Sequence, residues 1–208
     1  MEKVTVIFGG SFDPIHRGHV ELARYVAGRE EVDRVWLMVS PLNPLKQGRR
    51  LSPDVERLHM ARLAVAEVPG VEVSDFEMHL PRPSFTYATL RALEEAYPDR
   101  RFALLIGEDN WRDFHLWRNA DEILGRYPIY VYPRPGVRHA VAGTEAMNHP
   151  HPEALKHKEK AVMLTGAPRF DISSSQIRRR LAAGEDAADL LPPPVAAYLA
   201  NRTEEAKE

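Results

Sequence analysis

Short apolar runs alternate with amphipathic segments along this chain. Runs rich in Val, Ile, Leu and aromatic residues predict strands over 4–8, 32–39, 71–73, 102–106, 127–132 and 161–164. Apolar residues at helical spacing, or serine and proline start signals, predict helices over 20–27, 53–68, 87–97, 121–124, 173–181 and after 194. Alternating strands and helices build mostly parallel sheets. The pattern therefore predicts an α/β fold, Rossmann-like and doubly wound, with helices on both faces of a mostly parallel sheet.

Several predicted strands end in glycine, serine or proline, the residues of tight turns and ligand loops. These ends are Gly9, Ser40, Gly107 and Pro133. In open parallel sheets, ligands bind beyond the carboxyl ends of the strands, where the strand order reverses. We therefore expect the four ends to converge on one cleft.

The length of 208 residues, with 44% hydrophobic and 28% charged residues, fits one globular domain. We accordingly take residues 1–208 as a single domain. Residues 137–160 are polar and contain four histidines, and they are interpreted as a solvated loop or insertion in preference to a metal loop, because no ligand spacing repeats. Residues 203–208 are expected to fray as a tail.

Charge and composition limit the classes of partner. The net charge of −2 gives no global basic field for nucleic acid. The chain contains no apolar run near the ~20 residues of a membrane span and no signal-peptide pattern. The absence of cysteine excludes disulfides and thiol chemistry. We therefore expect a cytoplasmic protein without nucleic-acid or membrane partners; the oligomeric state, a homo-oligomer included, stays open.

The segment 9–19, GGSFDPIHRGH, follows the first strand and opens the first helix. Gly9 and Gly10 let the backbone approach a ligand closely, and the helix N-terminus that follows favours a phosphate. The spacing matches neither GxGxxG nor GxxxxGK[ST]. Its distinctive feature is the pair His16 and His19. Taken alone, such a pair is also typical of a surface helix start or half a zinc site, but a zinc site needs three or four ligands, so no protein metal site is predicted.

The segment 172–178, ISSSQIR, is the second candidate for phosphate chemistry. Its serines are suited to cap a helix, which is the simpler interpretation. However, Arg178 near a helix start opposes the helix dipole, and this placement favours an anion there. Hydroxyls, N–H groups and a guanidinium suit the β- and γ-phosphates of a triphosphate.

The first segment resembles the [ST]FDPxHxGH signature of the nucleotidylyltransferase superfamily, and the second resembles its ISSTxIRxR motif. The stretches PSFT at 83–86, IGED at 106–109, Trp117 and RPG at 134–136 occur in the order found in bacterial nicotinate mononucleotide adenylyltransferases. The resemblance extends from about residue 4 to about residue 200 and is weakest across 137–160.

The resemblance implies a role for each matching position. The catalytic residues would be His16, His19, Lys46 and Arg178. ATP would be bound by Gly9, Gly10, Ser11, Phe12, His16, His19, Gly107, Asp109, Ile172, Ser173, Ser174 and Arg178. Nicotinate mononucleotide would be bound by Ser11, Phe12, Asn43, Lys46, Ser84, Thr86, Trp117 and Arg134.

Two positions depart from the pattern of the relatives. Where many of them have Pro-Pro-His-Lys, this chain has Asn43-Pro44-Leu45-Lys46, so only the lysine charge remains. Where an aromatic residue often follows the tryptophan, this chain has Arg118, which affects the expected contacts to the pyridine.

The implied reaction joins ATP and nicotinate mononucleotide to give deamido-NAD and pyrophosphate, with Mg²⁺ bound through the triphosphate. The histidines would stabilise charge, since the mononucleotide phosphate is already ionised at pH 7 and needs no base. Two alternatives stay open. One is a sister transferase acting on nicotinamide mononucleotide or another phosphorylated acceptor such as phosphopantetheine. The other is a nucleotide-binding or nucleic-acid-binding protein without catalysis.

Overall fold

The computed structural model describes residues 3–41, 51–133 and 160–205, with side chains to residue 202. Within these ranges, six strands form one sheet in the order β3-β2-β1-β4-β5-β6, and every neighbouring pair is parallel. The strands are β1 (Val4–Gly10), β2 (Val32–Val39), β3 (Val71–Ser74), β4 (Phe102–Gly107), β5 (Ile129–Tyr132) and β6 (Ala161–Met163).

Helices connect the strands and extend the chain past the sheet. The described α-helices are α1 (Arg17–Ala27), α2 (Asp54–Val65), α3 (Thr86–Ala96), α4 (Glu108–Arg112), α5 (Ala120–Arg126), α6 (Ser174–Ala182) and α7 (Pro193–Glu205). Short 3₁₀ turns lie at Phe76–His79, Phe114–Leu116 and Ala188–Leu190.

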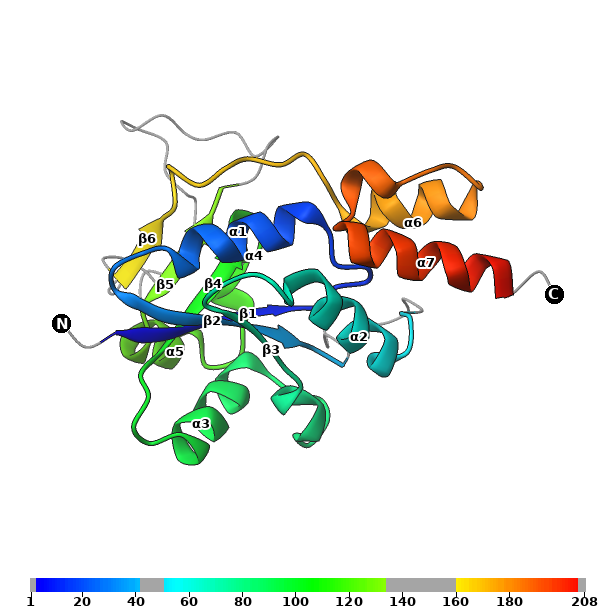
Figure 1. Cartoon of the computed structure of the whole chain (residues 1–208). Coiled ribbons are helices and arrows are strands. Elements are labelled where there is room, and N and C mark those ends of the chain that lie inside the picture. Colours follow the sequence, from blue (N-terminus) through cyan, green and yellow to red (C-terminus); the bar gives the residue numbers. More distant parts are fainter. Residues whose placement is uncertain (1–2, 42–50, 134–159, 206–208) are drawn as a thin grey trace.

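Two apolar layers, one on each face of the sheet, form the core. Because strand side chains alternate between faces, Val6 and Phe8 pack with α1, α2, α6 and α7, whereas Ile7 packs with α3 and α5. Figure 1 shows α1, α6 and α7 on one side of the sheet and α3 and α5 on the other. The central strands are therefore buried on both faces, which explains their continuous apolar sequence.

The strand order and the two helical layers confirm the predicted doubly wound α/β fold. The chain leaves β1 toward β2 and β3, then returns to add β4 on the other side of β1. β1 and β4 therefore flank the point where the strand order reverses, and their carboxyl ends, Gly10 and Gly107, are where this fold places ligands.

The sequence pattern identified most of the buried face of α2 but was wrong about its first turn. The helix begins at Asp54, with Pro53 at the N-cap, one residue later than predicted. Helical spacing groups Val55 with four apolar residues that are indeed buried, namely Leu58, Ala61, Val65 and Val68. Val55 itself is 75% exposed, and Arg57 is fully buried. The helix therefore directs a charged side chain into the interior beside the end of β2.

The predicted loop at 137–160 lies outside the described residues except for Lys160. α7 continues to Glu205, so it takes in the first part of the segment expected to fray. In the part of the chain that the structure describes, no helix has the length and apolar character to cross a membrane.

Candidate active site

The turn after β1 has an unusual backbone. Phe12 adopts φ +46°, a left-handed conformation that bulky residues rarely occupy. Its ring is 2% exposed and meets the rings of Phe8 and His19 edge-on, with centroid separations of 5.6 and 5.1 Å. Packing on both sides therefore holds a conformation that the isolated turn would disfavour.

The two predicted histidines form a stacked pair at the start of α1. Their ring centroids are 3.6 Å apart, with an angle of 21° between the planes. His16 is the N-cap residue and is 6% exposed. The backbone N–H of His16 donates to Nδ1 of His19 over 3.3 Å. Because Nδ1 accepts in this bond, a neutral His19 carries its proton on Nε2, from which it can donate.

The glycines on either side of this turn differ in how much space surrounds them. A Cβ at Gly10 would lie 3.0 Å from the Phe12 ring, and one at Gly18 would lie 3.2 Å from the His16 ring. Packing therefore favours glycine at both positions, because a Cβ would push these rings away. A Cβ at Gly9 would have no heavy atom of the described residues within 4 Å, and its φ is not in the left-handed range. The described fold does not require glycine at this position, which leaves room for the close approach of a ligand.

The start of α6 lies directly on the same turn. Ser173 caps the helix by accepting from the N–H of Gln176 over 3.2 Å. The hydroxyl of Ser174 donates to the carbonyl of Pro14 over 3.0 Å, and Arg178 Nη1 donates to the carbonyl of Asp13 over 2.5 Å. The tertiary structure thus brings together the two segments that the sequence singled out, more than 150 residues apart.

A second group of predicted residues gathers at the start of α3. Ser84 is buried, and Thr86 is the first residue of the helix. Trp117 is half-buried and packs on Phe114, with ring centroids 5.2 Å apart. The Arg118 guanidinium lies 5.1 Å from the centroid of the Phe85 ring, so the tryptophan segment meets the start of α3.

The remaining predicted residues have varied positions. Gly107 is the N-cap of α4 and Asp109 lies in its first turn, at the carboxyl end of β4. Ile172 packs against the core layer that contains α1 and α2. Three predicted residues, Asn43, Lys46 and Arg134, lie outside the described residues. Over the described ranges, His, Asp and Glu form no group of three or more that could hold a metal ion.

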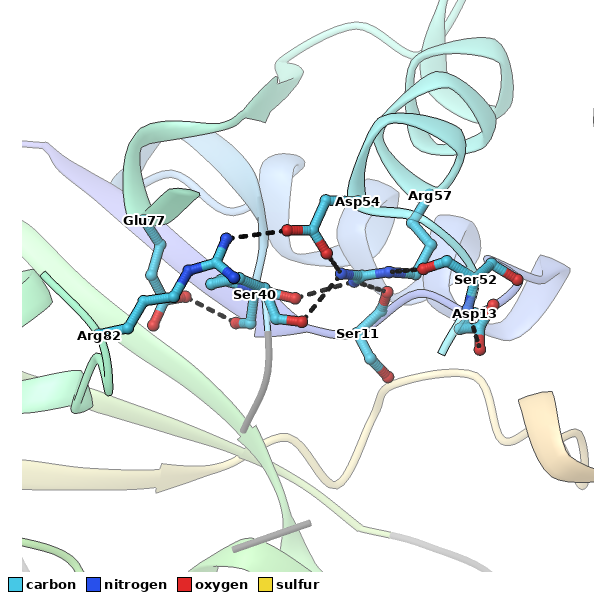
Figure 2. A network of polar contacts seen from close by, with 9 residues as sticks. Ser11, Asp13, Ser40, Ser52, Asp54, Arg57, Glu77 and Arg82 are labelled. Atoms are coloured by element: carbon cyan, nitrogen blue, oxygen red, sulfur yellow. Dashed lines mark hydrogen bonds and ion pairs between the residues drawn. The ribbon is translucent and has the colours of Figure 1, made fainter. Parts of the chain in front are cut away.

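Arg57 is the main feature that sequence reasoning missed. Its guanidinium is fully buried, and each of its five N–H groups has an acceptor. Figure 2 shows Arg57 among most of these partners. The acceptors are the carbonyls of Ser11 (2.6 Å), Ser40 (2.8 Å), Pro41 (3.0 Å) and Ser52 (3.0 Å) and the carboxylate of Asp54 (2.5 Å).

Further contacts continue this network toward α3. Asp54 also accepts a hydrogen bond, over 3.0 Å, from Arg82, which lies in the loop before α3. The buried carboxylate of Glu77 accepts from the hydroxyls of Ser40 (2.6 Å) and Thr89 (3.4 Å). The one signal in the sequence was a charge at position 57, four residues before the buried Ala61 and hence on the same helical face.

Comparison with known proteins identifies the family. The Cytidylyltransferase-like family model matches residues 7–180. The chain is 44% identical to "Probable nicotinate-nucleotide adenylyltransferase" of Bacteroides thetaiotaomicron, over 94% of this chain and 90% of that one. It is 42% identical to the protein of the same name from Bacteroides fragilis, over 96% and 92%.

The solved structures agree on the fold. Nicotinic acid mononucleotide adenylyltransferase of Plasmodium falciparum, complexed with NaAD, superposes with a TM-score of 0.75 at 19% identity, covering 97% of this chain and 96% of that chain. With the fold, the site and nearly full-length relatives in agreement, the chain belongs to the nicotinate-nucleotide adenylyltransferase family.

Proposed function

We propose that this protein transfers the adenylyl group of ATP to nicotinate mononucleotide, giving deamido-NAD and pyrophosphate. The observation that carries the proposal is the contact of Ser174 and Arg178 of α6 with the turn after β1, which leads into the histidine pair. This contact gathers helix N-termini, imidazoles and a guanidinium where the fold binds ligands. The names of the nearly full-length relatives support the choice of reaction.

ATP would lie over Gly9, with its phosphates at the N-terminus of α1. The open space above Gly9 supports this placement. The Nε2–H of His19 would donate to the phosphate oxygens on which charge develops in the transition state. Arg178, 37% exposed in its side chain, would reach the β- and γ-phosphates from α6.

The reaction needs alignment more than proton transfer. A phosphate oxygen of the mononucleotide attacks the α-phosphorus of ATP, and a new P–O bond forms. The bond between the α-phosphorus and the bridging oxygen breaks, and pyrophosphate leaves with the electron pair. The second pKa of a phosphate monoester is about 6, so the nucleophile is already ionised at pH 7. The protein groups would hold the in-line arrangement and neutralise charge.

Magnesium would arrive as part of the ATP substrate. Mg²⁺ keeps several waters and binds readily through phosphate oxygens. There it would neutralise phosphate charge.

The nicotinate ring would lie at the start of α3. The N–H groups of the first helical turn, which have no acceptor within the helix, and the Thr86 hydroxyl are donors, which suit a carboxylate. An amide would turn its own N–H₂ toward those donors and leave groups unpaired, at about 1–3 kcal/mol each. The half-buried Trp117 ring would stack on the pyridine.

The test is an acceptor panel. Purified protein with ATP and Mg²⁺ receives nicotinate mononucleotide, nicotinamide mononucleotide or phosphopantetheine, and pyrophosphate release is measured. We expect a kcat/KM for the acid about ten- to ten-thousand-fold above that for the amide, from one or two mismatched groups. Equal values for acid and amide would indicate a dual-specificity enzyme, and preference for phosphopantetheine would overturn the proposal.

A further inference from the structure

We infer that Arg57 is a positioning residue for adenylyl transfer, which holds the histidine pair in place through the carbonyl of Ser11. The inference rests on the proposed function, because the histidines matter only if they face the reacting phosphate. The five hydrogen bonds of the Arg57 guanidinium go to residues other than the two histidines. It would act through the backbone of the turn after β1.

The burial of Arg57 calls for a structural reason. A buried charge is unfavourable unless it is paired and fully hydrogen-bonded, and removing one partner of such a pair is strongly destabilising. The Arg57 guanidinium meets this condition with the Asp54 carboxylate and four backbone carbonyls. A leucine at this position would leave the four carbonyls without the donors that now hold them. We therefore infer that the role of Arg57 is to fix the orientation of these carbonyl groups.

The carbonyl of Ser11 belongs to the peptide group that precedes Phe12. The orientation of that group sets φ of Phe12, which is +46° and therefore strained for a bulky side chain. Arg57 Nη1 holds the carbonyl oxygen at 2.6 Å in a charge-assisted bond. This bond offsets part of the strain and keeps the peptide group in the orientation that the turn requires.

The orientation at Phe12 is passed to the catalytic pair by direct contact. The Phe12 ring meets the His19 ring edge-on at 5.1 Å, and His19 stacks on His16 at 3.6 Å. Releasing the Ser11 carbonyl would let the Phe12 ring move, and the His19 ring with it. A displacement of about 1 Å at a reacting group is enough to lower a rate 10²-fold.

The same nitrogen of Arg57 also holds the end of β2. Nη1 donates to the carbonyl of Ser40 over 2.8 Å, and the N–H of Ser40 donates to the carbonyl of Gly10 over 2.9 Å. The guanidinium therefore braces two neighbouring strand ends against each other. A lysine cannot replace it, because one ammonium has three donors and no planar fork.

The experiment compares Arg57→Lys and Asp54→Asn with a matched control, Arg62→Lys. Arg62 lies on the same helix, is 58% exposed in its side chain and pairs with Asp75 at 3.5 Å. Each folded protein is assayed for kcat and for KM of both substrates. The His19 ring resonances are followed by NMR, because the edge-on Phe12 ring shifts them in a geometry-dependent way.

We expect Arg57→Lys to lower kcat about 10- to 100-fold, to leave both KM values within about threefold and to move the His19 resonances. Asp54→Asn should change kcat and the resonances in the same direction by less, and Arg62→Lys should change neither. Wild-type kcat in Arg57→Lys, or a lower kcat with unmoved His19 resonances, would overturn the inference. If Arg57→Lys does not fold, the inference is judged on Asp54→Asn by the same two measurements, kcat and the His19 ring resonances.

Failure of the proposed function would be distinguishable from failure of this inference. If the wild-type protein released no pyrophosphate with any acceptor, the proposed function would fall. The NMR comparison would still show whether Arg57 controls the position of the His19 ring.

Discussion

The turn after β1 and the start of α6 lie in contact, yet they are held in different ways. Phe12, Asp13 and His16 of the turn are each 6% exposed or less, and Arg57 braces the backbone from inside. In α6 only Ile177 is buried, and the side chains of Ser174 and Arg178, its first and fifth residues, donate to the carbonyls of Pro14 and Asp13. The interior thus fixes the first of the two proposed phosphate-binding segments, and the second rests on it at the surface.

We infer from this difference that the two segments would contribute to different steps, one to the rate of the reaction and the other to ATP binding. Groups held by the interior keep their geometry with little cost of reorganisation, which is what stabilisation of a transition state needs. Groups on an exposed helix start can adjust to a ligand and contribute to affinity. We therefore expect changes in the turn to alter kcat most and changes in α6 to alter ATP binding or helix stability.

The largest effect is expected for His19→Ala. Loss of one preorganised donor should lower kcat by about 10²–10³ while the protein stays folded. Steady-state assays beside circular dichroism would measure both. His59→Ala is the matched control, because that exposed ring in α2 meets the ring of Tyr198, at 4.8 Å between centroids. Near-normal turnover in folded His19→Ala would remove the histidine from the proposed mechanism.

Gly9→Ala tests whether ATP approaches the backbone of β1. A methyl group there has room among the described residues, so the melting temperature should be unchanged or slightly higher. The same methyl would displace a bound nucleotide, and kcat/KM for ATP should fall by about 10². Unaltered kcat/KM in the stable variant would place the nucleotide elsewhere.

Gly10→Ala provides the contrast on the neighbouring residue. Its Cβ would press on the Phe12 ring at 3.0 Å, so this variant should lose stability where Gly9→Ala does not.

Arg178→Ala should weaken ATP binding about tenfold, as expected for the loss of one charge-assisted bond. Calorimetry should find the affinity for the mononucleotide nearly unchanged. Arg179→Ala, an exposed residue one position along the same helix, is the control. An ATP affinity equal to that of the wild type in Arg178→Ala would leave the α6 start as a helix cap and no more.

The smallest effect is expected for Ser173→Ala. Removing the oxygen that accepts from the Gln176 N–H should cost about 1 kcal/mol of stability. Denaturant unfolding would measure it, and turnover of the folded protein should be almost unaffected. A large loss of kcat at unchanged stability would mean that the exposed element is as critical for the rate as the buried turn.

Local pattern in the sequence was sufficient for the fold and for most elements. The alternation of apolar runs and amphipathic segments determined a parallel α/β sheet, because burial on both faces makes central strands continuously apolar. The Ser173 cap and the position of the histidine pair at a helix start also followed from local rules. Each of these depends on residues within a turn or two of one another.

Only the tertiary structure decided how the site is held. Local periodicity put Val55 on the buried face of α2 and gave no role to Arg57, yet Val55 is 75% exposed and Arg57 is fully buried. The acceptors that make this burial favourable come from the turn after β1, the end of β2 and the segment before α2. The contact of Ser174 with Pro14 spans 160 positions. Such partners are brought together by the fold, so no pattern of neighbouring residues can reveal them.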